Sequence, residues 1–267
     1  MSLFRPTSGC GPACLTASDR VSPLRFAARL TAAACVLLFF VVAPTRPALV
    51  RAVARALLAA LGLTFRVRGQ VRSGLLVANH VSWIDIVAVM ALDGDVRLVA
   101  KSEIAAWPVI GRLAVRQRAL FLDRQAPRRL PIVVADATRA LREGSIVAVF
   151  PEGTTGCGDC PVPMRPAFFQ AAVDAGVPVT PMTLSFTAAG QRSTAAAFIG
   201  EETLLTSLKR LAWARGTRLD VSAGAPIFPG SGADRRSLAR IAEINTRDIS
   251  RVAVPLGPLA ARGVLVA

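Results

Sequence analysis

A chain of 267 residues is long enough for one α/β domain with a buried core and an additional N-terminal segment. The composition is 53% hydrophobic and the net charge is +15, which together indicate a protein that meets an anionic membrane surface. Tyrosine is absent, aromatic residues make up 6% of the chain, and the basic residues are scattered. This composition argues against nucleic acid as a partner.

The N-terminal part combines a polar stretch with two apolar ones. Residues 1–25 lack periodicity and are predicted to be a mobile tail. Residues 26–63 are predicted to be membrane anchor helices. Their uncharged run, residues 30–43, is shorter than the roughly 20 residues that span a bilayer, and the stretch after Pro47 is amphipathic. A signal peptide is the alternative, but no clear cleavage site follows the apolar run.

The charge of this N-terminal part predicts its orientation. Arginines recur up to Arg72, whereas Asp19 is the only acidic residue in the same stretch. Positive charge beside apolar segments favours the cytoplasmic side of a membrane. We therefore expect the protein at the cell membrane, with the domain that follows on the cytoplasmic side.

Residues 64–255 alternate between short apolar runs and stretches with helical periodicity. This alternation predicts a single α/β domain with a mainly parallel or mixed sheet flanked by helices, and residues 256–267 are predicted to be a tail. The expected strands are 64–68, which has the pattern of an edge strand, 74–78, 96–100, 119–122, 145–150 and 177–186; the expected helices are 82–90, 131–142 and 166–175; weaker repeats of the pattern are 195–199, 202–214, 218–222 and 234–252.

The only histidine of the chain, His80, lies two positions after the second of these strands, and Asp85 lies five positions later. Any chemistry that needs an imidazole must use His80. The turn after a strand of an α/β sheet is a common place for ligands, and a carboxylate one turn into the next helix can hold the imidazole in one tautomer. The alternative interpretation is structural: Ser82 and Asp85 form a capping box, and His80 is an ordinary turn residue.

Four ordered blocks favour the functional interpretation and resemble one known family. The blocks are Asn79-His80-x-Ser82-x-x-Asp85; Lys101-Ser102-Glu103 with Phe121-Leu122-Asp123-Arg124; Phe150-Pro151-Glu152-Gly153-Thr154; and Val177-Pro178-Val179-Thr180-Pro181. Together they are similar to the signature of the glycerolipid acyltransferases, whose best-known members are the 1-acylglycerol-3-phosphate acyltransferases, over about residues 64 to 185.

The resemblance implies acyl transfer from a thioester to the hydroxyl of a lysophospholipid. His80 would be the general base and Asp85 its orienting carboxylate, so no serine nucleophile is needed, and no Gly-x-Ser-x-Gly motif is present. No cofactor is expected, because acyl-CoA or acyl carrier protein would serve as the co-substrate. The residues expected to bind substrate are Glu152, Gly153 and Thr154, whose turn can offer backbone N–H groups, then Arg124, and with less support Lys101 and Arg165.

The residue after Glu-Gly-Thr bears on the identity of the acceptor. Members of the family that use a phosphate acceptor usually carry Arg after Glu-Gly-Thr, whereas this chain has Thr155. The sequence favours 1-acylglycerol-3-phosphate only slightly, and similarity to the lyso-ornithine lipid acyltransferase branch makes an aminolipid the main alternative. A non-catalytic membrane-binding protein on the same scaffold is an alternative from another class, and the intact pair of His80 and Asp85 argues against it.

Five cysteines, an odd number, argue against a disulfide framework and for reduced thiols. Cys157 and Cys160 have the spacing of half a zinc knuckle, and Cys10 and Cys14 could supply the other half. Because the two pairs lie far apart in the sequence, no metal site is predicted.

Overall fold

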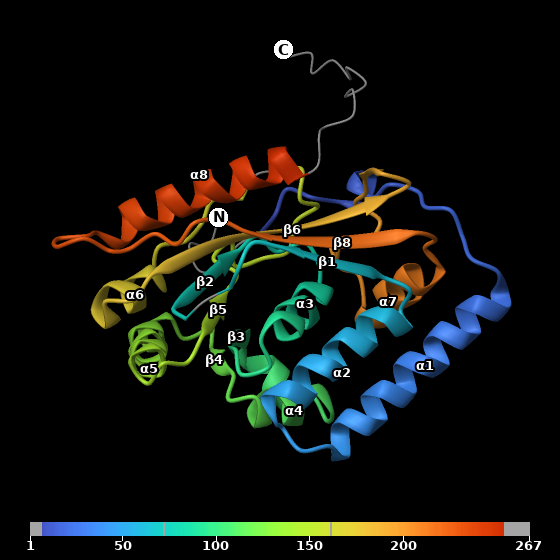
Figure 1. Ribbon diagram of the computed structural model, residues 1–267, viewed down its shortest axis with the longest axis horizontal. Helices are drawn as coiled ribbons and strands as arrows, with labels where there is room; N and C mark the ends of the chain where they lie inside the picture. The colour runs from blue at the N-terminus through green and yellow to red at the C-terminus, as the bar shows by residue number, and fades with distance from the viewer. Residues whose placement is uncertain (1–6, 72, 161, 254–267) are drawn as a thin grey trace, which may run out of the picture.

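The computed structural model describes residues 7–71, 73–160 and 162–253, and Figure 1 shows one twisted sheet with helices on both faces. The strands are β1 (Thr64–Arg68), β2 (Leu75–Ala78), β3 (Arg97–Lys101), β4 (Leu120–Leu122), β5 (Val147–Val149), β6 (Val179–Ala188), β7 (Gln191–Arg192) and β8 (Thr217–Ala223). The α-helices are α1 (Pro23–Val42), α2 (Pro47–Ala60), α3 (Ile84–Leu92), α4 (Ile110–Arg116), α5 (Leu130–Arg142), α6 (Phe169–Ala175), α7 (Leu204–Trp213) and α8 (Arg235–Ala253).

The sheet is mixed, in the order β1-β8-β6-β2-β5-β3-β4, with β7 paired to β6. Strands β6, β2, β5, β3 and β4 run parallel to one another, whereas β8 is antiparallel to β6 and parallel to the edge strand β1. The predicted α/β architecture is therefore confirmed. Because β2, β5, β3 and β4 are parallel neighbours, their carboxyl ends lie at one edge of the sheet.

Two apolar cores, one on each face, hold this sheet. Side chains alternate along a strand, so Leu75 and Val77 of β2 face one core while Leu76 and Ala78 face the other. The first core contains α5, α6 and α8; the second contains α2 and α3 (Figure 1). Strand β2 is fully buried, which is typical of a central strand covered by helices on both faces.

One expected strand is absent from the described part of the chain. Residues 195–199, one of the weaker repeats of the pattern, were expected to extend the sheet, but they begin within a turn in which the N–H of Ala197 donates to the carbonyl of Thr194. The chain leaves β6 at Ala189 and Gly190, which both have positive φ, and pairs back only as the two-residue strand β7. The apolar residues after β7 are buried without joining the ladder.

The N-terminal segment differs from the mobile tail predicted for residues 1–25. From Thr7 to Ser22 its described part lies against the domain: the N–H of Thr16 donates to Thr194 Oγ1 at 2.8 Å, and the N–H of Val21 donates to the carbonyl of Trp213 at 2.9 Å. The short 3₁₀ helix η1 (Pro12–Cys14) belongs to the same segment. The partners are distant in sequence, so local pattern reasoning could not find them. Residues 256–267, predicted to be a tail, lie outside the described residues.

Helix α1 begins at Pro23 and is 20 residues long, so it includes more than the uncharged run. Within the described chain it is the helix whose length and composition would allow it to cross a membrane. Both of its ends are nevertheless attached to the domain. Arg29 near one end donates to the carbonyls of Ala212 and Ala214, and Arg116 of α4 donates to carbonyls at the other end, including that of Val41 at 2.7 Å.

Candidate active site

His80 lies in the turn that joins β2 to α3, and Asp85 lies in the first turn of α3. The Nδ1 atom of His80 is 3.0 Å from Asp85 Oδ2, and the Asp85 side chain is fully buried while that of His80 is 17% exposed. Because the carboxylate oxygen can only accept, Nδ1 carries the hydrogen in this contact. The other ring nitrogen, Nε2, then carries the lone pair that a general base needs.

Asp85 also performs the capping role that was the structural alternative. Its Oδ2 atom accepts the backbone N–H groups of Val81 and Ser82 at 2.6 and 2.8 Å, so one oxygen holds both the turn and the imidazole. This is the reciprocal half of a capping box. The other oxygen, Oδ1, is buried without a hydrogen-bond partner among the described residues. The capping role of Asp85 is therefore compatible with its predicted role of orienting His80.

The end of β5 supports the same histidine from the other side. The Phe150 ring stacks on the His80 ring with centroids 4.1 Å apart and an interplanar angle of 16°. The N–H of His80 donates to Glu152 Oε2 at 3.1 Å, and the carbonyl of His80 accepts from the N–H of Gly156 at 2.8 Å. The third block of the sequence signature thus fixes the position of His80. Nothing in the residue pattern indicated the role of the Phe150 ring.

The structure gives Glu152 and Gly153 tasks that differ from the predicted contact with substrate. Glu152 accepts the N–H of His80, and the N–H of Gly153 donates to the carbonyl of Phe150 at 3.0 Å. Gly153 has φ of +73°, a conformation that favours glycine, so it closes this turn. Thr154 and Thr155 follow in the same half-buried loop.

Burial raises the pKa of Glu152 to about 8, and the negative charges of Asp85 and Glu243 add to this effect, while the His80 N–H and the Arg247 charge oppose it. Glu243 and Arg247 belong to α8, for which the sequence offered no site signal. The raised pKa means that folded protein keeps a proton that unfolded protein releases. This contribution to stability is complete below about 4.5 and is lost as the pH rises towards about 8.

We therefore expect the melting temperature to fall between about pH 5 and pH 8 more steeply in the wild type than in Glu152→Gln. The slopes of the unfolding free energy against pH should differ by at most about 1.4 kcal/mol per pH unit, the value for one bound proton. The Gln side chain keeps an oxygen that can accept the N–H of His80. Thermal unfolding of both proteins across this pH range measures the effect, and parallel curves would contradict it.

Three predicted basic residues form a separate group beside this turn. Arg124 follows β4, Lys101 ends β3, and the N–H of Arg165 donates to the carbonyl of Pro151 at 2.9 Å. Desolvation lowers the pKa of Arg124; the charge of Glu103 opposes this shift and that of Arg165 adds to it. Lys101 is exposed, and its pKa is lowered by desolvation and then by the charge of Arg124. The parallel strands thus bring together cations that are separated in the sequence.

Comparisons with known proteins agree with this arrangement. The family described as Acyltransferase matches residues 64–185. A lyso-ornithine lipid O-acyltransferase from Brucella abortus is 32% identical over 72% of this chain and 78% of its own length, and one from Pseudomonas aeruginosa is 35% identical over 76% and 78%. The chain therefore belongs to the acyltransferase family.

Two further similarities concern enzymes named for a phosphate acceptor. A 1-acyl-sn-glycerol-3-phosphate acyltransferase from Neisseria gonorrhoeae is 36% identical over 42% of this chain and 44% of its own length. The crystal structure of the 1-acyl-sn-glycerophosphate acyltransferase PlsC from Thermotoga maritima has a TM-score of 0.58 at 20% identity, covering 88% of this chain and 95% of the other. The structural similarity concerns the fold. The sequence relatives place this acyltransferase among enzymes of lysolipid acylation.

Proposed function

We propose that this protein transfers an acyl group from a thioester to the hydroxyl of a lysolipid, with His80 as the general base. The observation that carries the proposal is the 3.0 Å contact between His80 Nδ1 and the buried Asp85 carboxylate. As the acceptor oxygen attacks the thioester carbonyl, Nε2 takes the hydroxyl proton. Collapse of the tetrahedral intermediate breaks the C–S bond, and the imidazolium returns the proton to the leaving thiolate, so an ester and a thiol result.

The acceptor that we propose is a lyso-ornithine lipid. Two relatives named lyso-ornithine lipid O-acyltransferase match about three quarters of this chain. The 1-acyl-sn-glycerol-3-phosphate acyltransferase from Neisseria gonorrhoeae matches 42% of it. An ornithine headgroup offers one carboxylate and an ammonium group, which suits a loop that carries Thr155 where a cation would otherwise lie. Arg124 can bind one carboxylate in a bidentate fork. This reverses the slight preference for 1-acylglycerol-3-phosphate that the sequence blocks alone suggested.

1-Acylglycerol-3-phosphate remains the second candidate, because Lys101, Arg124 and Arg165 interact electrostatically in one region. A phosphate monoester carries up to two negative charges and is ordinarily bound by more than one cation.

Kinetics with both acceptors distinguish these candidates. Arg124→Ala should reduce kcat/KM for either acceptor by about 10- to 100-fold, since a hydrogen bond to a charged group is worth about 1.5–3 kcal/mol. Thr155→Arg should lower KM for 1-acylglycerol-3-phosphate but leave activity on lyso-ornithine lipid unchanged or reduced, because the new cation would face the acceptor's ammonium group. Arg128→Ala, which removes an exposed charge nearby, is the matched control.

The proposed acceptor is rejected if the unmodified enzyme prefers 1-acylglycerol-3-phosphate. The proposed binding role of Arg124 is rejected if Arg124→Ala and Arg128→Ala have equal kinetics.

The structure also supports association with a membrane through α1. Leu24, Leu38 and Val42 are strongly exposed on this helix, and an open apolar groove of about 370 Å³ lies between α1 and α2. Because both ends of α1 are attached to the domain, we propose that α1 lies in the membrane interface and does not cross it, on the cytoplasmic side indicated by the arginine-rich flanks.

Glu substitutions on the exposed face of α1 test this placement. The double variant Leu38→Glu, Val42→Glu should bind anionic vesicles at least about tenfold more weakly, because burying Leu or Val contributes about 1.5–3 kcal/mol each. Ile132→Glu changes an exposed apolar residue of α5 and should bind as the wild type does. Vesicle sedimentation measures both, and equal binding of the three proteins would place the anchor elsewhere.

A further inference from the structure

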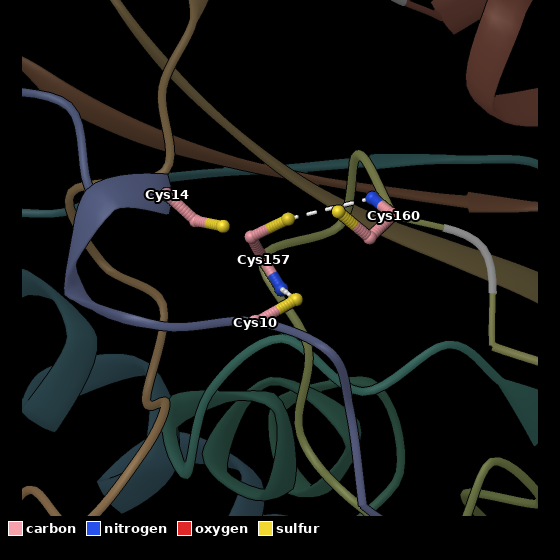
Figure 2. Close-up of side chains that lie close together, drawn as sticks. All are labelled: Cys10, Cys14, Cys157 and Cys160. Carbon is pink, nitrogen blue, oxygen red and sulfur yellow. Dashed lines mark hydrogen bonds between the residues drawn. The ribbon is translucent and has the colours of Figure 1, made fainter. Parts of the chain in front are cut away.

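The two cysteine pairs converge in space although Cys10 and Cys157 are 147 residues apart in the sequence. Cys10 and Cys14 belong to the N-terminal segment around η1, and Cys157 and Cys160 belong to the loop after β5. All four sulfur atoms lie within 4.8 Å of one another, and Figure 2 shows the side chains meeting between these two segments. The prediction of no metal site rested on the sequence separation of the pairs, and the fold removes that reason.

The spacing of the sulfur atoms suits a tetrahedral metal ion. With Zn–S bonds of about 2.3 Å, ideal tetrahedral geometry places the sulfur atoms about 3.8 Å apart, which requires only small movements from the observed arrangement. All five cysteines are free thiols in the structure. Four thiolate ligands are the donor set of structural zinc sites, and such a site leaves no coordination position for substrate.

Backbone donors already orient two of the four sulfur atoms. The N–H of Cys157 donates to Cys10 Sγ at 3.3 Å, and the N–H of Cys160 donates to Cys157 Sγ at 3.4 Å (Figure 2). Such hydrogen bonds fix ligand orientation, as the outer shell of a metal site does. Cys10 and Cys157 are buried, which protects half of the group from solvent.

Both segments are positioned by contacts that do not involve the thiols. Arg192 donates from Nη2 to the carbonyl of Gly158 at 2.6 Å and pairs through Nε with Asp159 at 2.7 Å, which shapes the tight turn between Cys157 and Cys160. On the other segment, Thr194 Oγ1 donates to the carbonyl of Cys14 at 2.6 Å. The thiol arrangement is therefore prepared by the fold before any ion binds.

We propose that Cys10, Cys14, Cys157 and Cys160 bind one structural Zn²⁺ ion. The ion joins the N-terminal segment to the loop that continues from the Glu152-Gly153-Thr154 turn. In that loop Gly156 directly precedes Cys157, and its N–H donates a hydrogen bond to the carbonyl of His80. Zinc thus stabilises the position of the catalytic turn and takes no part in acyl transfer.

Metal analysis of the full-length protein, purified under reducing conditions without chelator, tests the proposal. We expect about one zinc per chain in the wild type and in Cys35→Ser, which alters the exposed fifth cysteine in α1. Cys14→Ser and Cys160→Ser, at the less buried ligands, should retain less than about a tenth of that zinc. After chelation, added Co²⁺ should give thiolate-to-cobalt charge-transfer absorption in the wild type and Cys35→Ser but not in Cys14→Ser.

Each contrary result overturns the site. Wild-type protein that neither contains zinc nor develops the cobalt spectrum has no such site, and zinc retained by Cys14→Ser must be bound elsewhere. Mass spectrometry of protein isolated under non-reducing conditions with alkylation detects disulfides between these cysteines. Such disulfides would mean that a covalent bond, and not a metal ion, joins the two segments. The wild-type result decides the proposal even if a serine variant fails to fold.

Discussion

His80→Ala should lower kcat for acyl transfer by about 10² to 10⁴ while the protein stays folded. A positioned general base contributes about this factor, and the chain contains no second histidine that could substitute. The contacts of His80 with Glu152 and Gly156 use main-chain atoms, so alanine keeps them. Initial rates with a labelled acyl thioester measure the loss, and circular dichroism with thermal unfolding verifies the fold.

Added imidazole provides a control for this result. Alanine leaves a space against the Phe150 ring that a free imidazole can occupy, so partial recovery of turnover identifies the missing group as a base. If folded His80→Ala retains turnover within about tenfold of the wild type, His80 is not the base.

Asp85→Asn should lower kcat by about 10² to 10³, because it removes the charge that stabilises the imidazolium. Breaking a buried ion pair costs about 3–5 kcal/mol. The two N–H groups of Val81 and Ser82 point at Oδ2, so the amide should place its oxygen there and still accept from Nδ1. The tautomer is thereby kept, and lost charge explains the effect. The amide NH₂ would occupy the unpartnered Oδ1 position and cost about 1–3 kcal/mol of stability.

The single histidine makes this reasoning directly measurable. A sample labelled with ¹⁵N-histidine contains one imidazole, so its nitrogen shifts report the tautomer of His80 in both proteins. We expect the same tautomer, hydrogen on Nδ1, in wild type and Asp85→Asn. A change of tautomer would instead attribute the lost rate to misplaced hydrogen, and an unchanged rate would remove Asp85 from the mechanism.

The parts of the site that lie within one turn could be predicted from the sequence. His80 and Asp85 are five residues apart across a strand-to-helix junction, so their proximity follows from the local structure of that junction. The meeting of Lys101 and Arg124 was also accessible, because both follow strands predicted to be parallel. The order of the strands in the sheet could not be predicted, because it depends on how apolar faces pack across the whole domain.

The parts that depend on distant segments could not be predicted. The N-terminal segment has no periodic pattern, and its hydrogen bonds to Thr194 become visible only once β6 and β7 place that residue nearby. The same limit applies to the thiols of Cys10 and Cys157: they are 147 residues apart, and no local pattern indicates that they lie close together. The role of the Glu152 side chain was missed for a different reason: the prediction concerned the backbone N–H groups of its turn, whereas the carboxylate accepts the backbone N–H of His80.

The pairing of β1 with β8 has a consequence for how the enzyme is made. Thr64 lies opposite Arg218, so the edge strand has no partner in the sheet until the ribosome has synthesised most of the domain. Helix α1 leaves the ribosome well before that, so the proposed interfacial placement of α1 would bring the chain to lipid while the domain is still incomplete. Closing such distant contacts is slow and leaves apolar surface exposed in the meantime. With α1 in the membrane interface, as proposed above, the nascent chain would complete its sheet at the bilayer that holds the proposed lysolipid acceptor.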